Sequence, residues 1–256
     1  MNSIFRRNNS ESGDANKPTK PVTLYVIRLS PGCRVTWWYL IQTKIPYTLV
    51  DVDVITLDDK EEGTTEKKKL PEGCPPEGVP ALVDGDILVF GVHSVLRYLS
   101  SRYCSYYAFG KTLPTRMRVE SLIEWTENEL HRVLGYRCVY PQISQKYRLP
   151  SNLASDQLVE TGFKELAFLL EYLENKLLAT GTSTSSVYLC DKELTVVDFF
   201  VATILMQAEW ISFDLRLWPK LKSWLGSMKS QNGWDQVHKV HREFVQELKV
   251  LNEASL

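Results

Sequence analysis

The chain has 256 residues, of which 44% are hydrophobic and 24% are charged, as in an ordinary soluble globular protein. Thirty lysines and arginines stand against 31 aspartates and glutamates, which leaves a net charge of −1. Because there is no basic field to attract nucleic acid or an anionic membrane, we expect the protein to bind neither.

The N-terminal region predicts a tail followed by a parallel strand–helix–strand unit. Residues 1–20 are polar and lack apolar periodicity, so we expect a disordered tail. A buried strand is predicted over residues 22–27, and a helix over residues 33–44 that ends at Ile45-Pro46. The alternation of residues 47–54 predicts a half-exposed strand. Two strands joined in this way pair in parallel, with the helix as the crossover.

A hairpin is predicted after a long charged loop. Prolines and glycines within residues 56–78 leave room for a short helix at most, and Val79-Pro80 then leads into a strand. Asp84-Gly85 suits a tight turn, because glycine accepts the positive φ that such turns need. A strand over residues 87–90 and a helix over residues 94–103 follow.

In the second half of the chain, apolar residues recur at spacings of three and four, which predicts amphipathic helices. We therefore expect an α/β domain of thioredoxin-like layout at residues 21–105 and an all-α domain at residues 112–250. Thr195 and Asp198 have the spacing of a capping box that starts a buried helix. The longest apolar stretch, residues 194–208, is interrupted by this aspartate and is too short to cross a bilayer.

Five cysteines are scattered along the chain without a Cys-x-x-Cys pair. Their odd number and wide spacing favour reduced thiols in a cytoplasmic protein over a disulfide framework or a metal site. Ser30 and Cys33 have the spacing of a redox motif in which the first cysteine has been replaced. Because the first cysteine is normally the nucleophile, we interpret Cys33 as a packed side chain.

Short motifs occur in one collinear order across both predicted domains. They are Leu24-Tyr25, Leu29-Ser30, Cys33-Arg34, Ile45-Pro46-Tyr47, Val79-Pro80-Ala81-Leu82, Asp84-Gly85-Asp86, Arg116, Arg118-Val119-Glu120, Trp125, residues 194–199 and residues 234–238. Together they resemble a cytosolic glutathione transferase, and in detail the theta class. The resemblance implies a thioredoxin-like, glutathione-binding N-terminal domain followed by an all-α C-terminal domain.

In that family a Ser or Tyr after the first strand hydrogen-bonds the sulfur of glutathione, and the position falls on Ser30. A hydroxyl donor and the positive end of the following helix both favour a thiolate. From the residues alone, Ser30 is better explained as an N-cap, worth about 1 kcal/mol to its helix. The resemblance makes Ser30 the candidate catalytic residue.

The resemblance places further glutathione contacts at Val79, Pro80, Lys60, Gly91 and Val92. Pro80 matches the family's cis-proline, and the backbone of Val79 is expected to pair with the cysteinyl part of glutathione. Lys60 is either an ionic contact or a solvent-exposed lysine. Family members carry an acid or Gln followed by Ser where this chain has Gly91 and Val92, so we expect no side-chain contact to the γ-glutamyl group. Losing one or two charge-assisted hydrogen bonds weakens binding by about tenfold to ten-thousandfold, unless backbone N–H groups at this helix start still hold the carboxylate.

For the electrophile pocket the resemblance points to Leu29 and to His131, where the theta class often has a basic residue. His131 can also be read as a surface histidine. Glu120 and Trp125 match a dimer-side acid and a core aromatic, so a homodimer is implied. The family needs no cofactor and no metal, since glutathione acts as a co-substrate.

Two functions remain open. The first is an enzyme that conjugates glutathione to small apolar electrophiles, and Ser30 with Val79-Pro80 favours it. The second is a non-catalytic relative that acts as a dimeric scaffold or binds an apolar ligand, and Gly91-Val92 favours it. The sequence names neither the electrophile nor the oligomeric state.

Overall fold

The computed structural model describes residues 18, 20–52, 70–104, 108–178, 188–190 and 193–254. Most of the expected N-terminal tail, most of the charged loop and Lys60 lie outside these residues. The chain divides into two compact units, Met1–Tyr106 and Tyr107–Leu256. Each unit is described by itself.

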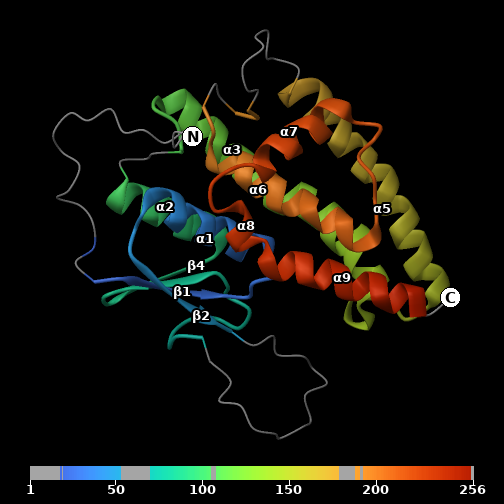
Figure 1. Ribbon diagram of the computed structural model, residues 1–256, viewed down its shortest axis with the longest axis horizontal. Helices are drawn as coiled ribbons and strands as arrows, with labels where there is room; N and C mark the ends of the chain where they lie inside the picture. Colours follow the sequence, from blue (N-terminus) through green and yellow to red (C-terminus); the bar gives the residue numbers. More distant parts are fainter. Residues whose placement is uncertain are drawn as a thin grey trace, which may run out of the picture. The chain divides into compact units, whose positions relative to one another are not determined.

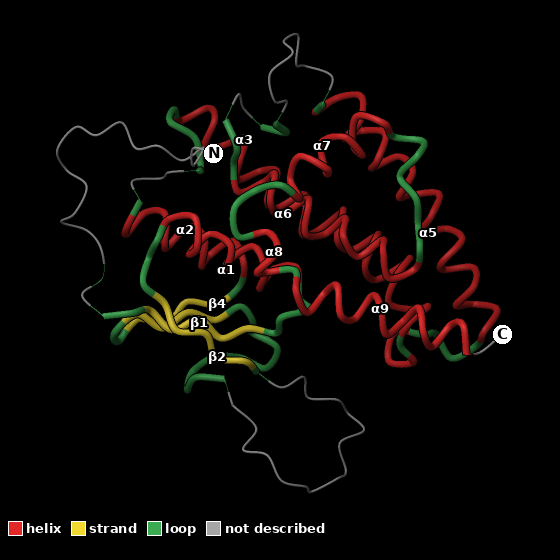
Figure 2. The backbone as a smooth tube through the Cα atoms, viewed as in Figure 1, coloured by secondary structure: helices red, strands yellow, loops and turns green. Residues whose placement is uncertain are grey.

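The first unit contains a four-stranded mixed sheet, seen in Figure 2. Its strands are β1 (Val22–Val26), β2 (Tyr47–Asp51), β3 (Ala81–Asp84) and β4 (Ile87–Phe90). β1 pairs in parallel with β2 and antiparallel with β3, and β3 pairs antiparallel with β4, so that the order is β2-β1-β3-β4. The inward-facing residues Val22, Leu24 and Val26 alternate along β1 and are at most 1% exposed. This is the thioredoxin-like layout expected from the sequence.

Helices α1 (Pro31–Thr43) and α2 (Val92–Tyr103) pack on each other and lie on the same side of the sheet (Figure 1). Both helices begin two residues earlier than predicted, at Pro31 and Val92. Proline suits the first helical position because its missing N–H has no intrahelical partner there. At α2 the chain turns at Gly91, whose φ is 83°.

Two phenols of α2 hold the turn between β3 and β4. The hydroxyl of Tyr98 donates to the Asp84 carboxylate at 2.7 Å, and the hydroxyl of Tyr103 donates to the same oxygen. Burial and the neighbouring carboxylate raise the pKa of Tyr98 to about 12, so the phenol remains protonated as a donor. The predicted Asp84-Gly85 turn is therefore also a point of tertiary attachment.

The second unit is helical throughout its described residues. Its elements are α3 (Leu113–Trp125), η1 (Thr126–Val139), α4 (Tyr140–Ile143), η2 (Gln145–Tyr147), α5 (Asn152–Tyr172), η3 (Leu173–Leu177), α6 (Val196–Leu205), η4 (Met206–Ile211), α7 (Pro219–Lys229), α8 (Trp234–Val237) and α9 (Lys239–Ala254). In η1 and η3 the backbone has the wider π-helical turns. Among the described residues no helix is long and apolar enough to span a membrane.

The predicted apolar faces are buried in most places, and one prediction at the end of α9 is wrong. Val119, Ile123 and Leu130 are completely buried in the core of the helical unit. Leu251 continues the spacing of Phe244 and Leu248 that predicts the apolar face of the last helix, but it is 63% exposed. Up to residue 251, Val245 is the last buried apolar side chain of this helix.

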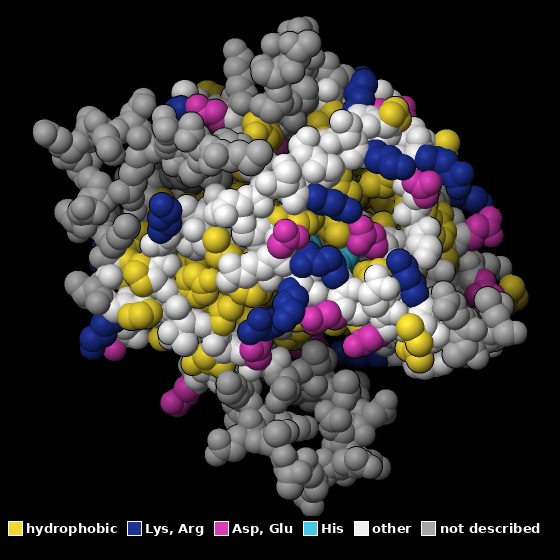
Figure 3. Space-filling model, viewed as in Figure 1, with side chains coloured by type: hydrophobic (Ala, Val, Ile, Leu, Met, Phe, Trp, Pro, Cys, Tyr) yellow, Lys and Arg dark blue, Asp and Glu magenta, His cyan; other side chains and the backbone are white. Residues whose placement is uncertain are grey.

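Charges on the surface are mixed. Figure 3 shows basic and acidic side chains interspersed on the face in view, without a field of one sign. This distribution agrees with the balanced composition of the chain. The face in view therefore has no basic patch of the kind that binds nucleic acid.

A buried carboxylate organises the start of α6. Asp198 is completely buried, and it accepts hydrogen bonds from the backbone N–H of Leu189 at 2.7 Å and of Thr195 at 2.9 Å. The Thr195 hydroxyl and the Trp224 indole N–H also donate to it, at 2.9 and 3.4 Å. Burial raises the pKa of Asp198 to about 6 and these hydrogen bonds oppose the rise, so the group is ionised at neutral pH. The capping box predicted from the sequence is confirmed.

Two other carboxylates fix helices of this unit. Glu174 of η3 accepts hydrogen bonds from the backbone N–H of Lys220 and of Leu221, at 3.0 and 2.7 Å, and so caps α7 from a distance. Glu209 of η4 accepts from Lys229 at 2.9 Å and lies 3.3 Å from Nε2 of the buried His241. Burial would raise the pKa of Glu209, but the hydrogen bonds from His241 and Lys229 outweigh it and lower this pKa to about 2.

Replacing Asp198 by Asn should strongly destabilise the helical unit. The amide nitrogen would face N–H donors that need an acceptor, so we expect Asp198→Asn to lower the free energy of unfolding by about 3 kcal/mol at pH 7. Chemical denaturation measures this. The control is Asp235→Asn, since the Asp235 side chain is 90% exposed, and its loss should cost less than about 1 kcal/mol. Equal stabilities of the two variants would contradict the assigned role of Asp198.

Candidate functional site

Ser30 lies between β1 and α1 and begins the helix. It is half-buried, with φ −64° and ψ 126°, and its Oγ accepts a hydrogen bond from the Cys33 N–H at 3.5 Å. This bond uses a lone pair of the oxygen, and the hydroxyl hydrogen is a separate donor. The two roles predicted for Ser30, helix cap and donor to a sulfur, are therefore compatible in one geometry.

Cys33 is a packed thiol. Its side chain is 1% exposed, and its Sγ accepts a hydrogen bond from the Ile27 N–H at 3.4 Å. Burial raises the pKa of Cys33 to about 11, although the hydrogen bonds oppose this shift. The thiol is therefore neutral at physiological pH, which disfavours a redox role.

The Val79–Pro80 peptide bond is cis, as the resemblance implied. Pro80 is buried, and its carbonyl accepts a hydrogen bond from the Gly91 N–H at 2.9 Å. The Val79 N–H donates to the Glu77 carbonyl at 2.8 Å. In this conformation the carbonyl of Val79 is the backbone group that remains for the pairing that the sequence analysis expected at this residue.

Three segments far apart in the sequence meet at Gly32, in the first turn of α1. A Cβ atom at Gly32 would lie 2.3 Å from Cγ2 of Val92 and 3.8 Å from both Cδ of Pro80 and Oγ of Ser30. The start of α1, the loop before β3 and the start of α2 therefore surround one point. The structure thus brings together three of the candidate site residues.

Gly91 and Val92 offer no polar side chain at this meeting point. Gly91 has φ 83° and ψ 147°, a conformation found essentially in glycine alone. Val92 is 6% exposed, and its methyl group occupies the space beside Gly32. The side chains that would bind an amino-acid head group are therefore absent from these two positions.

The two residues expected at the electrophile pocket belong to different units. Leu29 is half-buried and directly precedes Ser30 in the first unit. His131 is half-buried in η1 of the second unit, where its Nε2 lies 2.8 Å from the hydroxyl of Tyr140. The same hydroxyl accepts a hydrogen bond from Nε2 of Gln207 at 2.6 Å. His131 is therefore anchored in a hydrogen-bonded group and is not a simple surface histidine.

Tyr140 and Gln207 were not singled out by the sequence analysis. They are 67 positions apart, and no periodic pattern connects them. Aromatic rings surround the same group: Tyr140 lies 4.9 Å from Tyr136, 5.0 Å from Tyr147 and 6.3 Å from Trp210, measured between ring centroids. The only feature of the sequence that could have pointed to this group is the number of tyrosines between residues 136 and 147.

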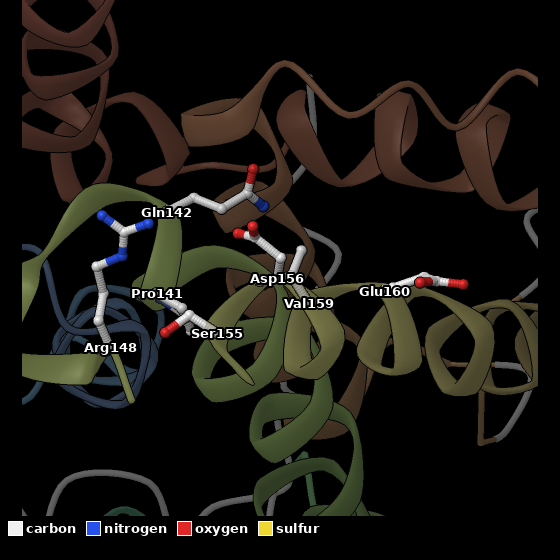
Figure 4. Close-up of a pocket in the computed structure, with 7 residues that line it drawn as sticks. All are labelled: Pro141, Gln142, Arg148, Ser155, Asp156, Val159 and Glu160. Atoms are coloured by element: carbon white, nitrogen blue, oxygen red, sulfur yellow. The ribbon is translucent and has the colours of Figure 1, made fainter. Parts of the chain in front are cut away.

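A separate hollow of about 420 Å³ lies on the second unit, between α4 and the start of α5 (Figure 4). It is lined by Pro141, Gln142, Arg148, Ser155, Asp156, Val159 and Glu160. None of these residues was predicted to bind a ligand. The buried Ser155 hydroxyl is engaged with the backbone of Leu149, and the charged side chains are exposed. We assign this hollow no role in the thiol site.

Within the described part of the chain, no group of three or more His, Cys, Asp or Glu side chains is arranged to hold a metal ion. The chemistry available at the meeting point of α1 and α2 is that of a hydroxyl donor, a helix N-terminus and backbone carbonyls. Such groups stabilise an anion or pair with a peptide.

Comparison with known proteins gives matches along most of the chain. Residues 24–105 match the family model of the glutathione S-transferase N-terminal domain, and residues 135–232 match that of the C-terminal domain. Human glutathione S-transferase theta-1 is 26% identical over 226 residues, which cover 85% of this chain and 86% of that protein. Dichloromethane dehalogenase from Methylophilus leisingeri is 31% identical over 97 residues, 38% of this chain and 34% of that protein.

Solved structures show the same fold. The apo form of human glutathione S-transferase T1-1 has a TM-score of 0.67 at 24% identity, covering 86% of this chain and 88% of that chain. A delta-class glutathione transferase of Nilaparvata lugens has a TM-score of 0.69 at 19% identity, covering 90% of this chain and 99% of that chain.

The contact between Gly32 and Val92 can be tested by a double-mutant cycle. The added Cβ of Gly32→Ala would collide with the Val92 methyl, so we expect a loss of about 1–3 kcal/mol in the free energy of unfolding. Adding Val92→Ala to Gly32→Ala should recover part of this loss, and chemical denaturation of all four proteins measures the coupling. Gly226→Ala is the control, because nothing lies within 4 Å of its Cβ position. In that helix it should stabilise by up to about 1 kcal/mol, and equal effects at both glycines would contradict the packing.

Proposed function

This chain belongs to the glutathione S-transferase family and is theta-like, and on that basis we propose that it conjugates glutathione to small apolar electrophiles. The observation that carries the proposal is the approach of Ser30 and Pro80 to one point at the N-terminus of α1. A hydroxyl donor, a helix N-terminus and the segment before a cis-proline are the elements that the family uses to hold a thiol peptide. Each of them is retained in this chain.

The role proposed for the Ser30 hydroxyl is to stabilise the thiolate of glutathione. A free thiol has a pKa of about 8.5, and lowering it by two units requires about 2.7 kcal/mol of preferential stabilisation. A hydrogen bond to a charged acceptor gives about 1.5–3 kcal/mol, and a helix terminus about 0.3–1 kcal/mol. The thiol proton leaves to solvent, the sulfur attacks an electrophilic carbon, and the leaving group departs with the electron pair of its broken bond.

The substrate class is proposed from the surroundings and the relatives. Leu29 gives the site an apolar neighbour. His131 is assigned to the electrophile pocket by the resemblance alone. One relative is named for its action on dichloromethane, a small halogenated compound. We include such compounds among the electrophiles to test, with glutathione as co-substrate and without a cofactor. We place the protein in the cytoplasm.

An exposed aromatic face on the helical unit is the proposed dimer contact. Phe168 and Tyr172 are one turn apart on α5 and are 77% and 40% exposed. Trp125 at the end of α3 was expected in the core, but it is half-buried and packs on Tyr172 with 5.4 Å between ring centroids. Large exposed aromatic groups of this kind mark protein contacts, and the family makes homodimers.

Loss of the Ser30 hydroxyl should impair conjugation. We expect Ser30→Ala to raise the pKa of bound glutathione by about 1–2 units and to lower the rate at pH 7 by about ten- to a hundredfold. Ultraviolet absorbance of the thiolate and conjugation rates measure the two effects, after isothermal calorimetry has shown that glutathione binds.

The control for the capping role is Ser30→Asp. Aspartate caps a helix as well as serine does, but its negative charge beside the sulfur disfavours a thiolate. This variant should keep its stability and lose activity. If Ser30→Ala conjugates at the wild-type rate, the catalytic role is wrong. If 10 mM glutathione gives no heat of binding, the non-catalytic alternative, a scaffold or apolar-ligand binder, is favoured instead.

Charge on the aromatic face should separate the dimer. We expect Phe168→Glu to sediment as a monomer in analytical ultracentrifugation, because dimerisation would bury an unpaired carboxylate. The control is Leu153→Glu on the same helix, whose side chain is also highly exposed at 70%, and which should remain dimeric. A wild-type chain that sediments as a monomer would contradict the dimer, and a dimeric Phe168→Glu would contradict the face.

A further inference from the structure

The proposed thiol site offers more contacts to the cysteinyl half of glutathione than to its γ-glutamyl half. Ser30 and the Val79 carbonyl lie in the segments assigned to the cysteinyl half. Gly91 and Val92 occupy the positions assigned to the amine and carboxylate of the γ-glutamyl half. The structure shows why the side chains at these two positions give the γ-glutamyl half no hydrogen bonds.

Position 92 is filled by a buried methyl group. Cγ2 of Val92 lies 2.3 Å from where a Gly32 Cβ would be, so the valine packs directly on the backbone of α1. Only 6% of its surface is exposed. A carboxylate placed against this side chain would lose hydration without receiving a hydrogen bond from it, which is unfavourable.

Position 91 is closed to side chains for a different reason. With φ 83° and ψ 147°, Gly91 has a backbone conformation in which any residue with a Cβ is strained. Its N–H is already bound to the Pro80 carbonyl at 2.9 Å. The turn into α2 is thus built around glycine, and position 91 has no side-chain acceptor for an ammonium group.

We propose that this site recognises cysteinyl thiols as a class, and binds N-acylated cysteinyl peptides without a γ-glutamyl head group about as well as glutathione. The inference rests on the proposed function, because the same Ser30 and Pro80 segments would hold the cysteinyl part. Val92 is the specificity-determining residue: its packing on Gly32 takes the place of a hydroxyl donor.

Two thioether probes test this inference. S-methylglutathione and N-acetyl-S-methylcysteinylglycine share the cysteinyl and glycyl parts and the amide before them. They differ in the amine and carboxylate of the γ-glutamyl group, and methylation removes any difference in thiol ionisation. We expect isothermal calorimetry on the full chain to give dissociation constants within about threefold of each other.

A variant at position 92 sharpens the test. Val92→Thr keeps the shape of the side chain and adds a hydroxyl, so it should bind S-methylglutathione about tenfold more tightly and the acetyl probe unchanged. Val92→Ala is the control, since it creates space without a donor and should not favour S-methylglutathione. Circular dichroism and denaturation establish that both variants are folded.

The outcomes separate this inference from the proposed function. A wild-type preference for S-methylglutathione of more than tenfold would overturn the class proposal and leave the transferase intact. Equal binding of both probes by Val92→Thr would overturn the role of Val92. If neither probe binds at 10 mM while glutathione does, this inference fails and the transferase remains. If glutathione also fails to bind, the proposed function fails with it.

Discussion

The thiol site depends on the close approach of α2 to the first turn of α1. Gly32 has no side chain, so the methyl group of Val92 can rest on its backbone. The hydrogen bond from Gly91 to the Pro80 carbonyl joins the loop before β3 to the same place. These contacts set the Ser30 hydroxyl near the proline, and they put an apolar methyl group at position 92. The contacts proposed for the cysteinyl part and the lack of a polar side chain at position 92 therefore meet at one point of the fold.

The helical unit is organised by buried or half-buried carboxylates. Asp198 binds the start of α6, Glu174 binds the start of α7, and Glu209 connects η4 to α9 through His241. Each places negative charge on N–H donors or on a cation, where it offsets the cost of its own burial. The group of His131 and Tyr140 is tied to η4, the element that carries Glu209, through the hydrogen bond from Gln207 to Tyr140.

Much of the fold could be predicted because its signals are local. A buried apolar run predicted β1, alternation predicted β2, a glycine turn predicted the hairpin, and the capping box predicted the start of α6. The errors occurred where a helix boundary or the burial of a side chain depends on packing or on the neighbouring turn. α2 begins two residues early, directly after Gly91, and Leu251, near the end of α9, is exposed. Periodicity shows which face of a helix is apolar, but it does not show how far the covering surface extends.

By itself the sequence determined the two-part architecture and, through its resemblance to a known family, it predicted a site at Ser30, Pro80, Gly91 and Val92. Turn chemistry, periodicity and motif order are carried by neighbouring residues, so they can be read along the chain. Only the tertiary structure decided that Val92 fills the space beside Gly32, that the Val79 N–H is already bonded, and that Tyr140 holds His131. Such contacts depend on how separate segments pack, and no local pattern specifies which side chains will meet.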